Sequence, residues 1–294
     1  MNTSDSTPTS FKHYLQEKAY SHETIATYQR MVDQFLKWLQ QEQIEADQVR
    51  YTEVLAYMKH CSTKGHNQKT IQGTVAVLAH YFDHLQQIES IENNPAKGIQ
   101  VQGVKRKTLH RILDPVELHA LYHQYQATTE SQQKNKVIVG MLVYQGIKAQ
   151  ELSKLEVKDV KLKEGTVEIP GSRKGDSRVL VLEPHQVLDM YHYLLQIRPQ
   201  FLAQIKQQTD KLFITKHGPY LPLQYIVERL AKQHPHFENI AQLRASVIVK
   251  WLRQYNLRQV QYMAGHRHIS TTEGYQQSNL EDLTEEIDRF HPLG

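Results

Sequence analysis

Near the C-terminus of the 294-residue chain stands the run Met263-Ala264-Gly265-His266-Arg267-His268-Ile269-Ser270-Thr271-Thr272-Glu273-Gly274-Tyr275. A glycine just past an apolar helical run is a stop signal, and Ser270 or Thr271 can begin the next helix. The pattern therefore predicts that Tyr275 lies on a separate element, which can move relative to His266. Taken alone, the run also fits a helical corner in which both side chains are ordinary packing residues.

Three segments further back in the chain carry basic side chains. Ile240-Ala241-Gln242-Leu243-Arg244-Ala245 opens an apolar helix, and Arg173-Lys174-Gly175-Asp176-Ser177-Arg178 lies between two short predicted strands. The third segment is Tyr144-Gln145-Gly146-Ile147-Lys148-Ala149-Gln150-Glu151-Leu152. In order, spacing and predicted element type, these segments and the C-terminal run resemble the tyrosine recombinase (phage integrase) family in its Xer-like two-domain layout. The resemblance extends from about residue 10 to residue 290.

The resemblance implies phosphoryl transfer on DNA. Tyr275 would attack a phosphodiester and form a 3′-phosphotyrosyl link, Arg244 would hold the phosphate through two nitrogens, and His266 would donate a hydrogen bond to a non-bridging oxygen. Lys174 would protonate the leaving 5′-oxygen, and Lys148 takes the place of the family's first arginine. Charge that develops on the phosphate requires preorganised cations, so neither a metal nor another cofactor is expected.

Two positions depart from the family pattern, because Lys148 replaces an arginine and Ala241 replaces a histidine. Lysine keeps the charge but lacks the planar fork, and losing one transition-state donor lowers a rate by on the order of a hundred- to a thousand-fold. The chain is therefore either an active site-specific recombinase or integrase, or a catalytically impaired DNA-binding relative that acts as a regulator or accessory factor. Retention of the other four positions favours activity. Topoisomerase-like strand swivelling is a third possibility.

The hydrophobic pattern predicts a mainly α chain with a small antiparallel β-sheet in its second domain. The strands are expected at Thr166–Ile169, Arg178–Leu182 and Leu212–Thr215. Helix starts are expected at capping residues, with Ser21, Asn67 and Asp114 as N-caps and Thr52 starting a shorter helix. The expected order is a flexible tail (1–10), a helical SAM-like core-DNA-binding domain (11–97), a basic linker (98–112) and a mixed α+β catalytic domain that ends in a helix (113–294).

The expected partner is double-stranded DNA, which the two domains would clamp from opposite faces. The basic residues expected to contact DNA lie at the start of an N-terminal helix, in the linker and in the predicted hairpin: Lys64, His66, Lys69, Lys105, Arg106, Lys107 and Arg173. Family members commonly exchange a C-terminal helix between neighbours, so a tetramer on DNA is expected. The residues that would form its apolar stripe are Leu280, Leu283, Ile287 and Phe290.

Composition argues against several other classes of protein. The net charge is only +4, and the single cysteine excludes an internal disulfide or a cysteine-based zinc site. No run approaches the roughly 20 apolar residues that span a bilayer, and the polar N-terminus does not resemble a signal peptide, so a cytoplasmic protein is expected. The pairs His80/His84 and His119/His123 lack the glutamate of zinc hydrolases, and no glycine-rich loop predicts a bound nucleotide.

Overall fold

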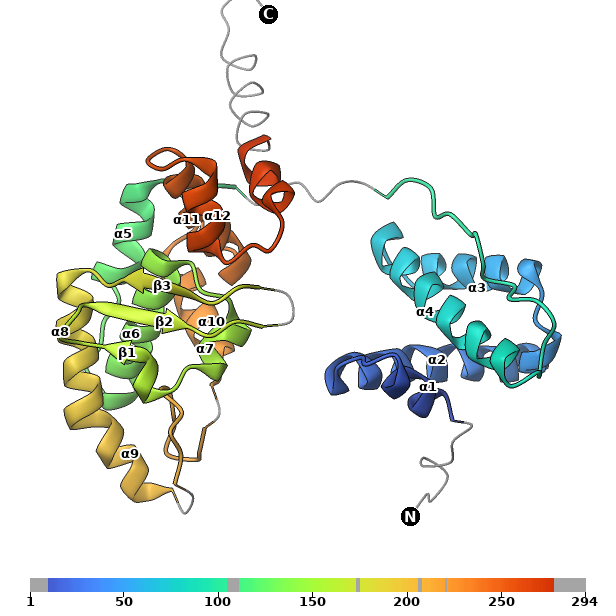
Figure 1. The fold of residues 1–294 in the computed structure, drawn as a ribbon, viewed down its shortest axis with the longest axis horizontal. Coiled ribbons are helices and arrows are strands. Elements are labelled where there is room, and N and C mark those ends of the chain that lie inside the picture. Colours follow the sequence, from blue (N-terminus) through green and yellow to red (C-terminus); the bar gives the residue numbers. More distant parts are fainter. Residues whose placement is uncertain (1–9, 105–110, 173–174, 206–207, 220, 278–294) are drawn as a thin grey trace, which may run out of the picture. The chain divides into compact units, whose positions relative to one another are not determined.

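The computed structural model describes residues 10–104, 111–172, 175–205, 208–219 and 221–277. The chain divides into two compact units, Met1–Lys107 and Thr108–Gly294. Each unit has its own hydrophobic core, and each is described by itself below (Figure 1).

All regular secondary structure in the described part of the first unit is helical, and irregular structure follows from residue 88. Hydroxyl or amide oxygens of Ser10, Ser21 and Asn67 accept the N–H group three residues further on and so begin three of its helices. The apolar side chains that recur every three or four residues, such as Phe35, Leu78 and Phe82, are fully buried. The elements are α1 (Phe11–Glu17), α2 (His22–Glu42), the 3₁₀ turn η1 (Ala46–Gln48), α3 (Tyr51–Thr63) and α4 (Gln68–Gln87).

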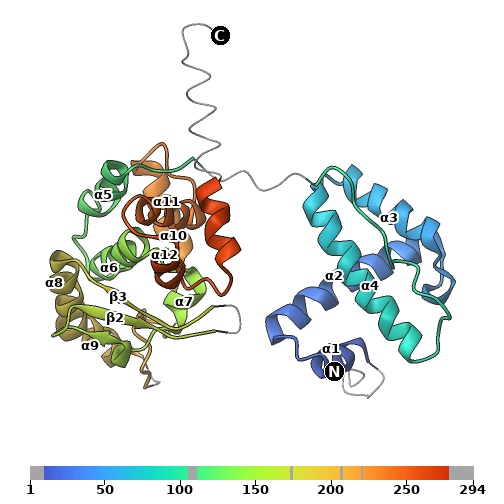
Figure 2. The same ribbon diagram turned by 45° about the horizontal axis from the view of Figure 1, so that its top comes forward.

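The second unit is built around α6 (Glu130–Gln145), in which every residue from Val137 to Gln145 is buried. Helices pack around α6, and the small sheet lies at one side of the unit (Figure 2). The helices are α5 (Pro115–His123), α7 (Ala149–Lys154), the 3₁₀ turn η2 (Val157–Asp159), α8 (Pro184–His192), the π-helical turn η3 (Tyr193–Ile197), α9 (Arg198–Gln204), α10 (Leu223–Gln233), α11 (Ile240–Leu252) and α12 (Leu257–Ala264). Residues 269–277 are also helical.

The sheet has three antiparallel strands in the order β1 (Val160–Lys161), β2 (Thr166–Ile169) and β3 (Arg178–Val181). Val167 pairs with both Val160 and Leu180, which fixes the register. In β3, buried and exposed residues alternate, so Arg178 and Leu180 face the interior. A buried arginine needs hydrogen-bond acceptors or an opposite charge, and those of Arg178 are described with the candidate active site.

The strand predicted at Leu212–Thr215 is wrong, because Leu212 to Ile214 are irregular, Thr215 forms only an isolated bridge with Gly218, and the third strand is β1. The apolar run is buried, but its backbone finds other partners. The Tyr193 hydroxyl donates to the Leu212 carbonyl at 2.8 Å and accepts the Ile214 N–H at 3.3 Å. The sequence analysis also missed the continuous helical segment α8–η3–α9. Pro199 near its end is a helix-breaking signal, and a π turn precedes it in the structure.

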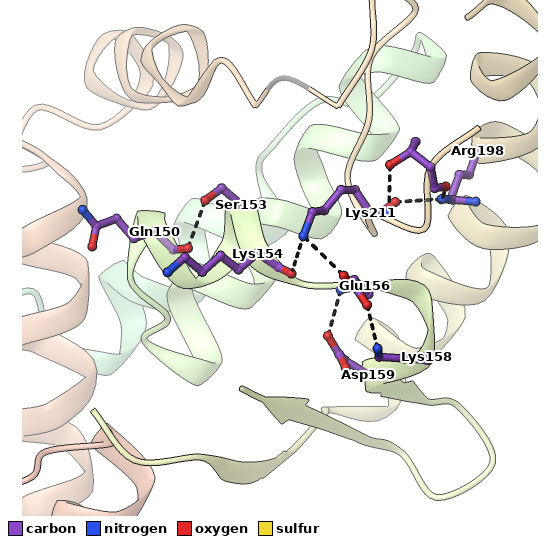
Figure 3. A network of polar contacts seen from close by, with 9 residues as sticks. Gln150, Ser153, Lys154, Glu156, Lys158, Asp159, Arg198 and Lys211 are labelled. Carbon is purple, nitrogen blue, oxygen red and sulfur yellow. Dashed lines mark hydrogen bonds and ion pairs between the residues drawn. The ribbon is translucent and has the colours of Figure 1, made fainter. Parts of the chain in front are cut away.

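A polar network joins the end of α7 to the loop that follows α9 (Figure 3). The Lys211 ammonium donates to the Lys154 carbonyl at 3.1 Å and lies 3.4 Å from Glu156. Arg198, which is 8% exposed, donates to the Thr209 carbonyl at 2.7 Å and to the Lys211 carbonyl at 2.8 Å. These bonds hold the loop against the segment that leads from α7 into the sheet.

We expect Arg198→Ala to lower the free energy of unfolding of the second unit by about 2–4 kcal/mol, because two carbonyls lose a charged donor inside the protein. Lys158→Ala is the matched control from the same network. Its ion pair with Glu156 (2.8 Å) is solvent-exposed and should contribute little. Urea denaturation followed by circular dichroism gives both values, and equal losses would contradict the expectation.

Candidate active site

Four of the residues singled out in the sequence lie together in the second unit. Lys148 stands at the N-cap of α7, Arg244 on α11, His266 directly after the glycine that ends α12, and Tyr275 on the helix of residues 269–277. The predicted break between His266 and Tyr275 is present: α12 ends at Ala264 and helical structure resumes at residue 269. The fold thus gathers three cationic or titratable groups around one tyrosine.

Arg244 is 8% exposed and is held by the ends of two helices. Its NH1 donates to the Gly146 carbonyl and its NH2 to the Ala264 carbonyl, both at 2.6 Å. NH2 also lies 3.2 Å from Nε2 of His266. Carbonyls at helix C-termini carry partial negative charge, which favours a buried cation. A guanidinium has five N–H groups, so donors remain beyond these three contacts, and the Tyr275 hydroxyl is a further hydrogen-bond partner of Arg244.

His266 is 7% exposed, and its tautomer follows from its partners. Because a guanidinium can only donate, Nε2 accepts from Arg244, and Nδ1 carries the hydrogen and donates to Oγ1 of Thr272 at 2.9 Å. Burial, followed by the charges of Arg244, Lys148 and Arg178, lowers the pKa of His266 to about 4. In the protein without DNA, the inward nitrogen of this histidine is therefore an acceptor, whereas the sequence analysis expected a donor.

Tyr275 lies directly against this pair. Its ring is nearly parallel to the His266 ring, with centroids 5.7 Å apart and planes 10° from each other. Burial lowers the pKa of Arg244, whereas the nearby Glu151 carboxylate and Tyr275 phenol both raise it. The tyrosine is only partly buried, and its hydroxyl is a hydrogen-bond partner of Arg244.

A buried ion pair that the sequence analysis did not single out braces the site. Arg178, whose side chain is 1% exposed, donates to the Glu151 carboxylate through NH1 at 3.0 Å and NH2 at 2.8 Å. Its Nε donates to the Met263 carbonyl at 2.9 Å. Burial acts to raise the pKa of Glu151, but the bonds and charge of Arg178 outweigh it and lower that pKa. An arginine at an inward position of a strand was the signal that pointed to such a partner.

Lys148 is linked to the same carboxylate. Its backbone N–H donates to Glu151 at 2.9 Å, and its ammonium lies 4.0 Å from the other carboxylate oxygen. Burial first, and then Arg244, lower the pKa of Lys148. Lys148 therefore begins α7, and its partner Glu151 is not a solvated surface residue, since its side chain is 11% exposed.

Gly265 is required for two reasons. Its φ is +62°, a left-handed conformation that favours glycine, and an added Cβ would lie 2.5 Å from NH1 of Arg178. A Cβ added to Gly175 would lie 3.0 Å from the carbonyl oxygen of Gly265 and 3.9 Å from the Lys148 ammonium. The residue that follows Lys174 in the chain thus reaches the site.

The remaining predicted residues divide into two groups. Lys64, His66 and Lys69 are exposed around the turn between α3 and α4, and Ala241 is exposed in the first turn of α11. The following residues lie outside the described part of the chain: Lys105, Arg106, Lys107, Arg173, Lys174 and the apolar stripe after residue 277.

The described residues offer neither a metal site nor a membrane-spanning helix. They contain no group of three or more histidine, cysteine or acidic side chains placed to hold a metal ion. None of their helices is both long enough and apolar enough to cross a membrane.

Models of known protein families match both units of the chain. Residues 111–282 match the model of the phage integrase family, and residues 9–88 match the phage integrase N-terminal SAM-like domain. The chain belongs to the phage integrase family. As a member of it, the protein has the mainly α fold with a small antiparallel sheet and the two family modules that the sequence analysis predicted.

Relatives of known name match nearly the whole chain. Tyrosine recombinase XerC of Anoxybacillus flavithermus is 27% identical, with 96% of each chain covered, and tyrosine recombinase XerD of Listeria innocua is 26% identical, with 96% of this chain and 97% of the relative covered. Among solved structures, XerH site-specific recombinase bound to a palindromic difH substrate has a TM-score of 0.71 at 17% identity, covering 93% of this chain and 81% of that one. The Tn1549 transposon integrase bound to transposon right end DNA has a TM-score of 0.65 at 17% identity, covering 95% and 98%.

We expect Gly265→Ala to destabilise this phage integrase family member more than Gly165→Ala does. Both glycines have a φ of +62°, so both variants strain the backbone equally, by about 1–2 kcal/mol. At Gly165 the new methyl meets only Val187 at 3.9 Å, whereas at Gly265 it overlaps Arg178, which adds roughly 1–3 kcal/mol. Denaturant midpoints of the two variants measure the difference. Equal midpoints would show that Arg178 moves aside without loss.

We also expect the wild type to lose stability on acidification in a way that His266→Gln does not. The pKa of His266 is about 4 in the folded protein, against an ordinary value of 6.5, so its neutral form stabilises the fold above pH 6.5 and this stability is lost as the pH falls. Between pH 7 and pH 5 the loss amounts to roughly 2 kcal/mol. Unfolding free energies of both proteins at the two pH values test this, and parallel slopes would refute it.

Proposed function

We propose that this chain is a site-specific DNA recombinase or integrase that cuts and rejoins DNA through a 3′-phosphotyrosyl intermediate. The observation that carries the proposal is the stacking of Tyr275 on His266 beside the buried Arg244. The relatives named as tyrosine recombinases match the chain almost from end to end, and none of the matches above favours the impaired regulator.

The first step in this proposal is capture of a DNA phosphate. The N–H groups of Arg244 that the Gly146 and Ala264 carbonyls do not use would bind two phosphate oxygens, as a guanidinium fork does best. Lys148 would add a second charge to the same phosphate. Its ammonium lies 4.0 Å from Glu151 and its side chain is 38% exposed, so it can reach a ligand.

In the second step the Tyr275 oxygen attacks phosphorus, the phosphorus–O5′ bond breaks, and Lys174 would supply the proton for the leaving oxygen. The phosphate is transferred to tyrosine and not to water, so the reverse attack by a 5′-hydroxyl of another strand restores the DNA backbone. Swivelling without exchange uses the same two steps at a single site and differs only in which strand returns.

The proposal includes the partner and its assembly. Double-stranded DNA would contact Lys64, His66 and Lys69 in the first unit and the linker residues Lys105 to Lys107. Arg173 would add a contact from the hairpin. Tetramer formation on DNA through the segment after residue 277 and a cytoplasmic location remain predictions from the sequence.

Relaxation of negatively supercoiled plasmid at low salt without magnesium tests the function. We expect the wild type to relax the plasmid and to form a covalent protein–DNA adduct, and Tyr275→Phe to lose at least a thousandfold in rate because only the phenol oxygen can attack. Tyr255→Phe, which changes an exposed tyrosine of the same unit, should match the wild type. Lys148→Arg should be as fast or faster, since the fork binds phosphate better than a point charge.

Relaxation by Tyr275→Phe would overturn the assignment of the nucleophile. A wild type that binds DNA and relaxes nothing, while Lys148→Arg is active, would establish the impaired relative. Recombination between two copies of a selected binding site on one plasmid then separates strand exchange from swivelling.

A further inference from the structure

The proposed reaction leaves one proton without a destination. The Tyr275 hydroxyl must lose it on attack, yet the position where the family carries a histidine is Ala241, which has no group to receive it. We propose, as an extension that rests on the proposed function, that His266 takes this proton and that Thr272 is the positioning residue that prepares it. This changes the role expected for His266 from hydrogen-bond donor to proton acceptor.

The hydrogen bonds already set the histidine in the accepting form. Thr272 is 0% exposed, and its Oγ1 lies 2.9 Å from Nδ1 of His266. Since Nε2 faces a group that can only donate, the ring hydrogen is on Nδ1, and the lone pair of Nε2 points to the Arg244 guanidinium. The Tyr275 hydroxyl is a hydrogen-bond partner of the same guanidinium, so only this tautomer presents a proton-accepting nitrogen to the group that Tyr275 also contacts.

The other groups around His266 are less suited to the task. Glu151 on α7 uses its carboxylate for Arg178 and for the N–H of Lys148. The guanidiniums of Arg178 on β3 and Arg244 on α11 do not give up their charge. Lys148 is required in its charged form to attract phosphate. That leaves the neutral imidazole stacked on the Tyr275 ring.

Phosphate binding would switch this base on. In the free protein, burial and then the charges of Arg244, Lys148 and Arg178 keep the pKa of His266 low. A phosphate bound to Arg244 and Lys148 brings a negative charge that offsets those cations, and it competes with Nε2 for the N–H of Arg244. His266 thus gains proton affinity only when a substrate is present.

The step balances. The Tyr275 O–H bond breaks and its proton passes to Nε2 of His266, while the oxygen pair forms the bond to phosphorus. The phosphorus–O5′ bond breaks, and its electron pair takes a proton from Lys174. When a 5′-hydroxyl returns, both protons move back, so His266 acts as a base in cleavage and as an acid in rejoining.

The test is the pH dependence of plasmid relaxation between pH 5.5 and 9, measured for the wild type, His266→Gln, Thr272→Val and Thr272→Ser. Wild-type rates should fall on the acid side as His266 becomes protonated. In His266→Gln the amide still donates a hydrogen bond but takes up no proton. Its rate should therefore be lower by about a hundredfold or more, and it should lack the acid limb, the decrease of rate at low pH. Thr272→Val should lose about tenfold and shift the limb, and Thr272→Ser, which keeps the hydroxyl, should restore most of the rate.

Several outcomes would overturn the inference. If the relaxation rate of His266→Gln stays within threefold of the wild-type rate and falls at low pH in the same way, His266 acts only as a hydrogen-bond donor. The proposed function would still hold in that case if Tyr275→Phe is inactive. If Lys148→Arg no longer loses rate at low pH, the wild-type decrease at low pH is due to Lys148 and not to His266. If denaturation shows that His266→Gln does not fold, equal rates for Thr272→Val and Thr272→Ser would refute the proposal. A wild type without relaxation activity would remove both the function and the inference.

Discussion

The buried ion pair between Arg178 and Glu151 fixes the positions of three segments that are far apart in the sequence. Arg178 belongs to strand β3, and its guanidinium donates to Glu151 in the first turn of α7 and to the carbonyl of Met263 in α12. Removing one partner of such a pair leaves an uncompensated charge and is strongly destabilising, by about 3–5 kcal/mol. The backbone N–H of Lys148 donates to Glu151, and Arg178 fills the space that a side chain at Gly265 would need, so this ion pair constrains residues on both sides of the site.

Charge balance explains why this site suits an anion. Arg178, Arg244 and Lys148 surround one carboxylate, and two helix-terminal carbonyls stabilise Arg244 as well. The carboxylate and both carbonyls already accept hydrogen bonds from these cations. The interior of the site therefore has a net positive charge and N–H groups that can bind a further acceptor. Such preorganised cations favour charge that develops on a phosphate, because little reorganisation is needed when it arrives. The low pKa of His266 reflects the same field.

Local sequence signals predicted much of the scaffold. Capping residues such as Ser21, Asn67 and Asp114 placed helix starts, because a short side chain that accepts an N–H stabilises that end directly. The prediction failed where an apolar run was read as a strand: Leu212 to Ile214 are buried, but their backbone bonds go to Tyr193 and Leu155. Hydrophobicity reports burial, and it does not report which partner the backbone finds.

The sequence by itself determined the family and singled out Tyr275, His266, Arg244 and Lys148 as candidates, because each stands in a motif with its own local signature. Tertiary structure alone decided that Arg178 and Glu151 form the brace, that Thr272 sets the tautomer of His266, and that Nε2 accepts from Arg244. These partners come from different elements, so no spacing along the chain encodes them. A hydrogen bond depends on distances of a few tenths of an ångström, and only the packed fold sets those.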